Sequence, residues 1–133
     1  MSENEVLNLF TPLHGLNLVA HFTVPKVRTW GSKEDQVFKQ QLRSISGLKP
    51  GDGDAYTWFA FRIVCRLAKS RERIKHQVPD VENIPKLIVD AFTGLLYPDD
   101  NLTYVRGVQV EAEFSADETE WTEVWINGMP GRE

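Results

Sequence analysis

Cysteine and histidine are scarce in this 133-residue sequence, and it contains no long apolar run. The single cysteine, Cys65, excludes an intramolecular disulfide bond and a cysteine-rich zinc site. The three histidines are scattered and form no pair at helical ligand spacing, so a structural zinc site is not expected. No apolar run approaches the ~20 residues that a membrane-spanning helix needs, so we expect no membrane partner. The first residues are acidic where a secretory signal would be basic, which predicts a cytoplasmic protein.

Charge is unevenly distributed along the chain. The net charge of −4 at pH 7 at first argues against a nucleic-acid partner. Residues 66–75 are nevertheless strongly basic, whereas residues 111–133 are strongly acidic. A polyanion responds to the local potential more than to the total charge, so the basic segment predicts an anionic partner. The length and ordinary composition, without repeats or a long linker, indicate a single domain over residues 1–133.

Apolar periodicity predicts the order strand, helix, strand, helix, strand, strand. The strands are expected at residues 17–24, 56–67, 102–114 and 121–126, the last two as a hairpin pair. The helices are expected from an N-cap at Ser32 to about Ile45 and from about Asn83 to Thr93. The tail at residues 127–133 is expected to be disordered. These elements indicate an α+β fold, a small mixed β-sheet with two helices in β-α-β-α-β-β order.

The strand at residues 56–67 has the clearest alternation in the chain. Its odd positions from 59 to 67 are apolar and are expected in the core. Cys65 is one of them, and we interpret it as a small buried residue and not as a reactive thiol. Trp58, Arg62 and Arg66 are expected on the opposite face of the strand, as a mixed aromatic and basic surface.

Carboxylates gather around one lysine in the second half of the chain, at Asp80, Glu82, Lys86, Asp99 and Asp100. Carboxylates that lie close together repel one another unless a cation lies between them, and a divalent metal ion is the usual one. The basic segment leads directly into this cluster. The combination predicts a metal-dependent phosphoryl-transfer enzyme, in which the basic segment holds an anionic backbone that is cut at the carboxylates.

Each part of the cluster also has a purely structural explanation. Glu82, Lys86 and Asp90 share one helix face, where Glu82 and Lys86 would form a surface ion pair worth ~0.3–0.5 kcal/mol. Acids near a helix N-terminus are stabilised by its dipole, and Pro-Asp-Asp is common turn chemistry. The single elements favour the structural interpretation, whereas their combination with Asn83 and the basic segment favours a site.

A spaced pattern runs through this region: Asp80-x-Glu82-Asn83-x-x-Lys86, then Asp90-Ala91, then Asp99-Asp100. It resembles the RusA family of Holliday junction resolvases. These are small endonucleases that act in DNA recombination and repair and cut four-way DNA junctions as homodimers with Mg²⁺. The match covers residues 60–114, and before residue 50 the likeness is only a strand and a helix in the right order.

The resemblance implies roles for individual residues. The catalytic residues would be Asp80, Glu82, Lys86 and Asp100. The metal ion, Mg²⁺ with Mn²⁺ as an alternative, would be held by Asp80, Glu82 and Asp100, with Asp99 assisting. The family usually has aspartate where this chain has Glu82, whose side chain reaches one methylene further. The DNA-binding residues are expected in the basic strand and loop: Arg62, Arg66, Lys69, Arg71, Arg73 and Lys75.

The resemblance therefore implies an enzyme, an endodeoxyribonuclease that resolves four-way junctions by paired phosphodiester hydrolysis. Two alternatives stay open. The first is a catalytically weak or inactive relative that binds branched DNA, which the glutamate at position 82 allows. The second is an interaction domain that binds no nucleic acid, in line with a pI near 5.4.

Overall fold

The computed structural model describes residues 15–28, 35–74 and 81–131. Ser32, Lys75 and Asp80, which the sequence analysis singled out, lie outside these residues. The elements follow one another as β1 (Asn17–Val24), α2 (Asp35–Ser46), η1 (Asp52–Ala55), β2 (Tyr56–Leu67), η2 (Lys69–Arg73), α3 (Asn83–Ala91), β3 (Val105–Phe114) and β4 (Trp121–Pro130). Apart from the short 3₁₀ helices η1 and η2, this is the predicted β-α-β-α-β-β order, so the α+β fold class is confirmed.

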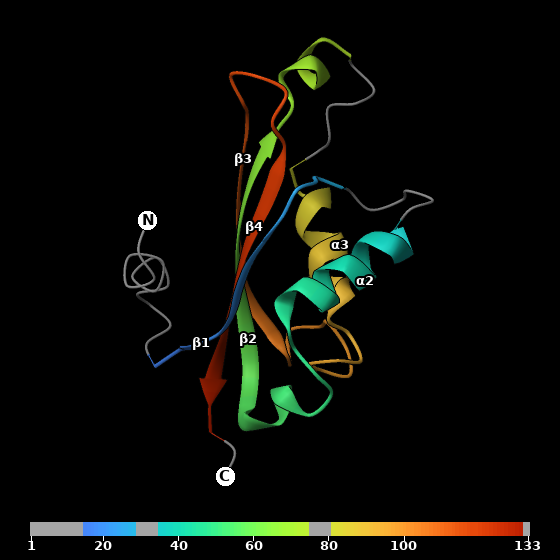
Figure 1. Cartoon of the computed structure of the whole chain (residues 1–133). Helices are drawn as coiled ribbons and strands as arrows, with labels where there is room; N and C mark the ends of the chain where they lie inside the picture. Colours follow the sequence, from blue (N-terminus) through green and yellow to red (C-terminus); the bar gives the residue numbers. More distant parts are fainter. Residues whose placement is uncertain (1–14, 29–34, 75–80, 132–133) are drawn as a thin grey trace.

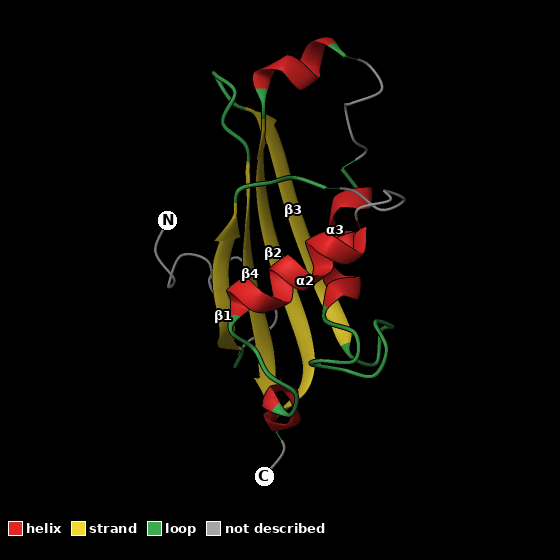
Figure 2. Ribbon diagram, turned by 45° about the vertical axis from the view of Figure 1, so that its right-hand side comes forward, coloured by secondary structure: helices red, strands yellow, loops and turns green. Residues whose placement is uncertain are grey.

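The four strands form one mixed sheet in the order β1-β4-β2-β3. Strand β2 pairs in parallel with β3, whereas β4 is antiparallel to both β1 and β2. Helices α2 and α3 lie on the same face of this sheet (Figure 1 and Figure 2). Helix α3 is the crossover between the parallel strands β2 and β3, which is the usual way to join such a pair. The edge strand β3 therefore lies beside the helix that connects it to the sheet.

The predicted hairpin between the last two strands is wrong, because β2 lies between them. The connecting loop is held around the end of β2 by backbone bonds, Lys69 N–H to Asp117 O (2.8 Å) and Ser115 N–H to Leu67 O (2.8 Å). Glu120 adds a further bond by accepting from the backbone N–H of Ala68 at 3.0 Å. The loop thus crosses the end of β2, so that β4 pairs with β2 on the side opposite β3.

The predicted disorder of the tail from Asn127 is also wrong for the residues that the structure describes. Strand β4 continues through Pro130, and Asn127 and Gly128 are buried. Asparagine, glycine and proline are common in turns, but pairing with β1 and β2 on both sides overrides that preference here. Gly128 is needed here, because a Cβ atom at this position would lie 2.5 Å from the ring of Tyr56.

The core lies between the helices and the sheet, as the pattern of β2 predicts. The odd positions 59–67 of β2 are all buried, and so are Phe38 and Leu42 of α2. On the opposite face of β2 the prediction of a mixed surface is only partly right. Trp58 and Arg62 are 9% and 3% exposed, and Arg62 donates to Glu111 of β3 at 2.8 Å. Neighbouring strands bury these large side chains, and the apolar alternation along β2 alone could not predict that burial.

No helix in the described part of the chain is long and apolar enough to cross a membrane.

Candidate active site

A depression of about 300 Å³ lies between the outer side of α3 and the edge strand β3. Its charged lining residues are Glu82, Lys86 and Asp100, which are three of the four predicted catalytic residues. The fourth, Asp80, lies outside the described residues. Pro85, Val89, Val105 and Val108 complete the wall. Three charged groups from two separate segments of the sequence therefore share one concave surface.

Helix α3 presents Glu82 and Lys86 because its apolar residues point the other way. Ile84, Leu87 and Ile88 are buried against the sheet, so positions on the outer side of the helix remain at the surface. Glu82 occupies the N-cap position, yet its side chain makes no capping hydrogen bond. Its carboxylate is therefore not used to satisfy the backbone N–H groups at the start of the helix.

Asp99 and Asp100 play different parts in the turn before β3. Both oxygens of Asp99 accept hydrogen bonds inside the turn, Oδ1 from the backbone N–H of Asp100 at 2.8 Å and Oδ2 from Asn101 Nδ2 at 3.1 Å. This is the local side-chain to backbone bonding that aspartate provides in turns. Asp99 does not line the depression, whereas Asp100 does. The turn is thus shaped by one acid and exposes the other.

The three charged residues at the depression are exposed to solvent. Among the described residues, Glu82, Lys86 and the Asp100 carboxylate have no ion pair and no side-chain hydrogen bond, and the expected Glu82–Lys86 pair is not formed. Asp90, predicted on the same helix face, instead forms an ion pair with Lys39 of α2. Elsewhere on the sheet, Arg62 pairs with Glu111. Their charged groups are therefore available to a ligand that enters the depression.

Helix α3 is fixed at its C-terminal end by two polar contacts with α2. Arg43 donates to the carbonyl oxygens of Ala91 and Thr93, which are among the acceptors that the end of a helix leaves unsatisfied. The Lys39–Asp90 pair lies on the same side. A rigid α3 keeps the positions of Glu82 and Lys86 fixed relative to the sheet.

Tyr97 connects α3 with the turn that carries Asp100. Its hydroxyl donates to the carbonyl oxygen of Val89 at 2.5 Å, and its side chain is buried. Burial raises the pKa of Tyr97 far above its usual value, and the charges of Asp100 and Asp90 raise it further. The hydroxyl therefore stays protonated and remains a donor.

The predicted DNA-binding residues fall into two groups. Arg62, Arg66 and Arg71 are engaged within the protein: their side chains are 4%, 31% and 23% exposed and form ion pairs with Glu111, Glu113 and Glu120. Arg66 also lies over the ring of Trp121, 5.4 Å from its centre. Lys69 and Arg73 of η2 are exposed, and Lys75 lies outside the described residues. Among the described residues predicted to bind DNA, the exposed cations are therefore Lys69 and Arg73 of η2, whereas Arg62 is buried.

The donor set of the depression fits a magnesium ion. No group of three metal-binding side chains is found within residues 15–28, 35–74 and 81–131. Glu82 and Asp100 supply two carboxylates, and Asp80 precedes Glu82 by two positions. Mg²⁺ is commonly bound by one or two carboxylates, while water and substrate phosphate provide its other ligands. The chemistry of these residues therefore suits a hard divalent cation.

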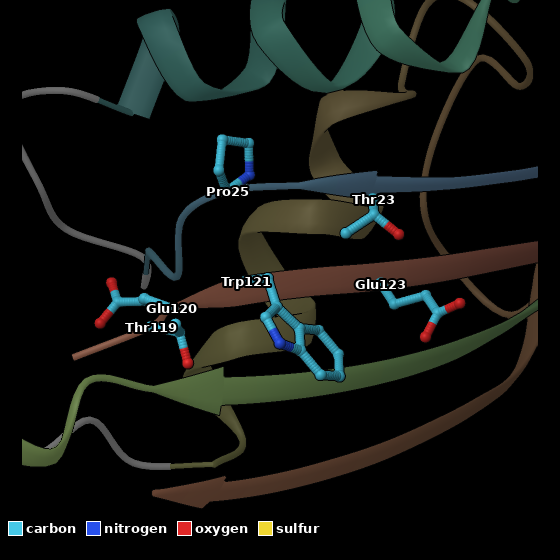
Figure 3. Close-up of a pocket in the computed structure, with 6 residues that line it drawn as sticks. All are labelled: Thr23, Pro25, Thr119, Glu120, Trp121 and Glu123. Atoms are coloured by element: carbon cyan, nitrogen blue, oxygen red, sulfur yellow. The ribbon is translucent and has the colours of Figure 1, made fainter. Parts of the chain in front are cut away.

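A larger pocket of about 600 Å³ lies where β1 ends and β4 begins (Figure 3). Its lining includes Glu120, Trp121 and Glu123. Glu120 accepts hydrogen bonds from Arg71 and from the backbone N–H of Ala68, and Glu123 is paired with His21. Its carboxylates are already satisfied within the protein, so the pocket lacks the available charges of the smaller depression.

Sequence reasoning missed the apolar wall of the depression. Val105 and Val108 line it together, although an odd and an even position cannot share a face of a regular strand. A register shift where β3 begins, between the partners Phe59 and Ala60 of β2, explains this. Gly107 between the two valines was the available signal, because glycine inside a strand pattern often marks a bulge.

A small α+β fold with two carboxylates and a lysine lining one depression, and with exposed cations in η2, defines a candidate phosphodiester-cleaving enzyme. Comparison with family models makes the assignment: the model of endodeoxyribonuclease RusA matches residues 15–127. The chain belongs to this family, which confirms the resemblance and extends it well beyond residues 60–114. Membership implies a Holliday junction resolvase that acts on branched DNA. Comparison with curated proteins gives no match.

Proposed function

We propose that this protein cuts four-way DNA junctions by hydrolysing a phosphodiester bond in two opposed strands, with Mg²⁺, or Mn²⁺ in its place. The observation that carries the proposal is the depression that Glu82, Lys86 and Asp100 line together, with no ion-pair partner among the described residues. Family membership supports the substrate class. Its place is then in DNA recombination and repair, in the cytoplasm.

The acids would hold the metal ion. Glu82 and Asp100 supply carboxylate oxygens from two sides of the depression, and Asp80 would add a third. Asp99 contributes by shaping the turn, since its oxygens already accept hydrogen bonds. Held there, a divalent ion would supply the positive charge that polarises a scissile phosphate and makes a bound water molecule more acidic. The Glu82 carboxylate is available for this role, because it makes no capping bond.

Lys86 would act on the phosphate itself. It lies one helical turn after Glu82 and lines the same depression. Because no acid among the described residues neutralises it, its ammonium group can donate to a phosphate oxygen. A fixed cation at this position stabilises the negative charge that develops as the bond to the leaving oxygen breaks.

The exposed cations Lys69 and Arg73, together with Lys75, would contact backbone phosphates on the way to the depression. Such contacts add affinity that depends on salt and not on sequence. A homodimer with twofold symmetry would present two depressions to two strands, which is the geometry that paired cuts require.

The test is cleavage of a synthetic four-way junction, with linear duplex of the same sequence as control, in Mg²⁺, Mn²⁺ and EDTA. The proposal expects symmetric paired nicks in the junction that need the metal and disappear in Asp80→Asn. Equal cutting of the junction and the linear duplex would support a nuclease but contradict its specificity for junctions. Tight junction binding without cutting would identify a binding relative, and neither binding nor cutting would favour the interaction-domain alternative.

A further inference from the structure

In the segment between α3 and β3, Tyr97 forms hydrogen bonds through both its backbone and its side chain. The carbonyl oxygen of Tyr97 accepts from the backbone N–H of Gly94 at 2.7 Å. Its hydroxyl crosses back to the carbonyl oxygen of Val89 at 2.5 Å. Tyr97 therefore connects the last turn of α3 with the residues that lead into the Asp99–Asp100 turn.

The Tyr97 hydroxyl supplies a hydrogen-bond donor to a carbonyl group at the end of α3. Val89 belongs to the last turn of α3, where carbonyl groups lose the usual partner four residues later. The backbone N–H of Thr93 bonds instead to Asp90 O at 3.1 Å, and Val89 O receives only the N–H of Phe92 at 3.2 Å from the backbone. Val89 also lines the depression. The bond thus ends on a residue that lines the depression.

We propose that Tyr97 is a positioning residue, whose hydroxyl holds the Asp100 turn against α3 so that Asp100 faces Glu82 and Lys86. The role rests on the proposed function, because it matters only if Asp100 binds the metal ion. Tyr97 does not itself line the depression, because it is buried with its ring against Phe59 at a centroid distance of 5.5 Å.

The chain offers a matched control for removing this hydroxyl. The ring of Tyr56 also packs on Phe59, at 5.6 Å and with the same interplanar angle of 57°. Within the described part of the chain its hydroxyl forms no hydrogen bond. Tyr97→Phe and Tyr56→Phe therefore remove the same atom from two similar ring contacts, and only the first removes a bond to α3.

The experiment measures Mn²⁺ binding without DNA, by the electron paramagnetic resonance of the free ion, in wild type and both variants. All proteins are compared at a temperature where circular dichroism shows each to be folded. We expect Tyr97→Phe to raise the Mn²⁺ dissociation constant about tenfold, as loss of an outer partner of a metal ligand typically does. Tyr56→Phe should bind as wild type does, and metal-free junction binding should be unchanged in both.

A double-mutant cycle separates positioning from general loss of structure. If Tyr97 acts through Asp100, its substitution should have little further effect in an Asp100→Asn background, because coupled residues are not additive. A full additional loss in that background, an equal loss in Tyr56→Phe, or wild-type Mn²⁺ binding by Tyr97→Phe would each overturn the proposal. If the wild-type protein bound no Mn²⁺ and cut no junction, the proposed function itself would fail.

Discussion

Glu82 at the start of α3 and Asp100 in the turn before β3 line the same depression, and neither carboxylate has a partner among the described residues. Lys86 lies between them in the sequence and lines the depression as well. The crossover from β2 to β3 brings these two segments together, since α3 must pack beside the strand that it leads to. Three charged residues that are separate in the sequence therefore line one candidate site.

Loss of either carboxylate should stop cleavage without unfolding the protein. Glu82→Gln and Asp100→Asn are expected to lower junction cleavage by more than about 100-fold, while junction binding in EDTA stays near the wild-type value. Both positions are exposed, so the midpoint of thermal unfolding should change little. A single-turnover assay with gel-shift binding measures both quantities.

Asp99→Asn provides the contrast within the same turn. An asparagine retains an oxygen that accepts the backbone N–H of Asp100. We therefore expect a loss of cleavage about tenfold smaller than that of Asp100→Asn. Equal losses in the two variants would show that Asp99 binds the metal directly.

Replacing Lys86 tests the role of its charge. Lys86→Met keeps the length of the side chain and removes the ammonium group, and we expect cleavage to fall by about 100-fold. Lys86→Arg should retain part of the activity, because it keeps the charge in a different geometry. If Lys86 were only a surface residue, both variants would cut like wild type under saturating Mg²⁺.

The basic residues should separate into binding and structural groups. Lys69→Gln and Arg73→Gln remove exposed cations of η2, and each should weaken junction binding and reduce the slope of log K against log salt by about one. Arg62→Gln removes a buried cation paired with Glu111. It should leave that slope unchanged and lower the free energy of unfolding by about 1–3 kcal/mol. A change of slope in Arg62→Gln would mean that this side chain does reach the DNA.

Cys65 should make the protein less stable at alkaline pH. Burial raises the pKa of its thiol from 9.0 to about 11, since the thiolate is excluded from the core. Below pH 9 the thiol is protonated in both states; between pH 9 and 11 only the unfolded chain ionises. The free energy of unfolding should therefore fall by about 2–3 kcal/mol across this window. Urea unfolding at several pH values should show a smaller fall for Cys65→Ala, and equal slopes would contradict the prediction.

The sequence was most informative where one pattern determined one element. Strand β2 extends from Tyr56 to Leu67 as predicted, and α3 begins at Asn83 as its apolar stripe indicates. Glu82, Lys86 and Asp100 were predicted as a group, and the structure places them on one depression. That grouping depended on the spacing of the motif and not on secondary structure alone.

The features that the sequence analysis missed depend on contacts between distant residues. The insertion of β4 between β1 and β2 follows from pairing partners that no local pattern specifies. Burial of Arg62 comes from neighbouring strands and from Glu111. The bond from Tyr97 to Val89 joins two segments around a helix end. Tertiary packing overrides local preference in each of these cases.

The most direct test of the central claim is a crystal structure of the protein with Mn²⁺, using the anomalous scattering of the metal to locate it. We expect an anomalous peak in the depression, within bonding distance of carboxylate oxygens of both Glu82 and Asp100. A peak elsewhere on the protein, or no peak in the depression at saturating Mn²⁺, would contradict the assignment of these residues as the metal site.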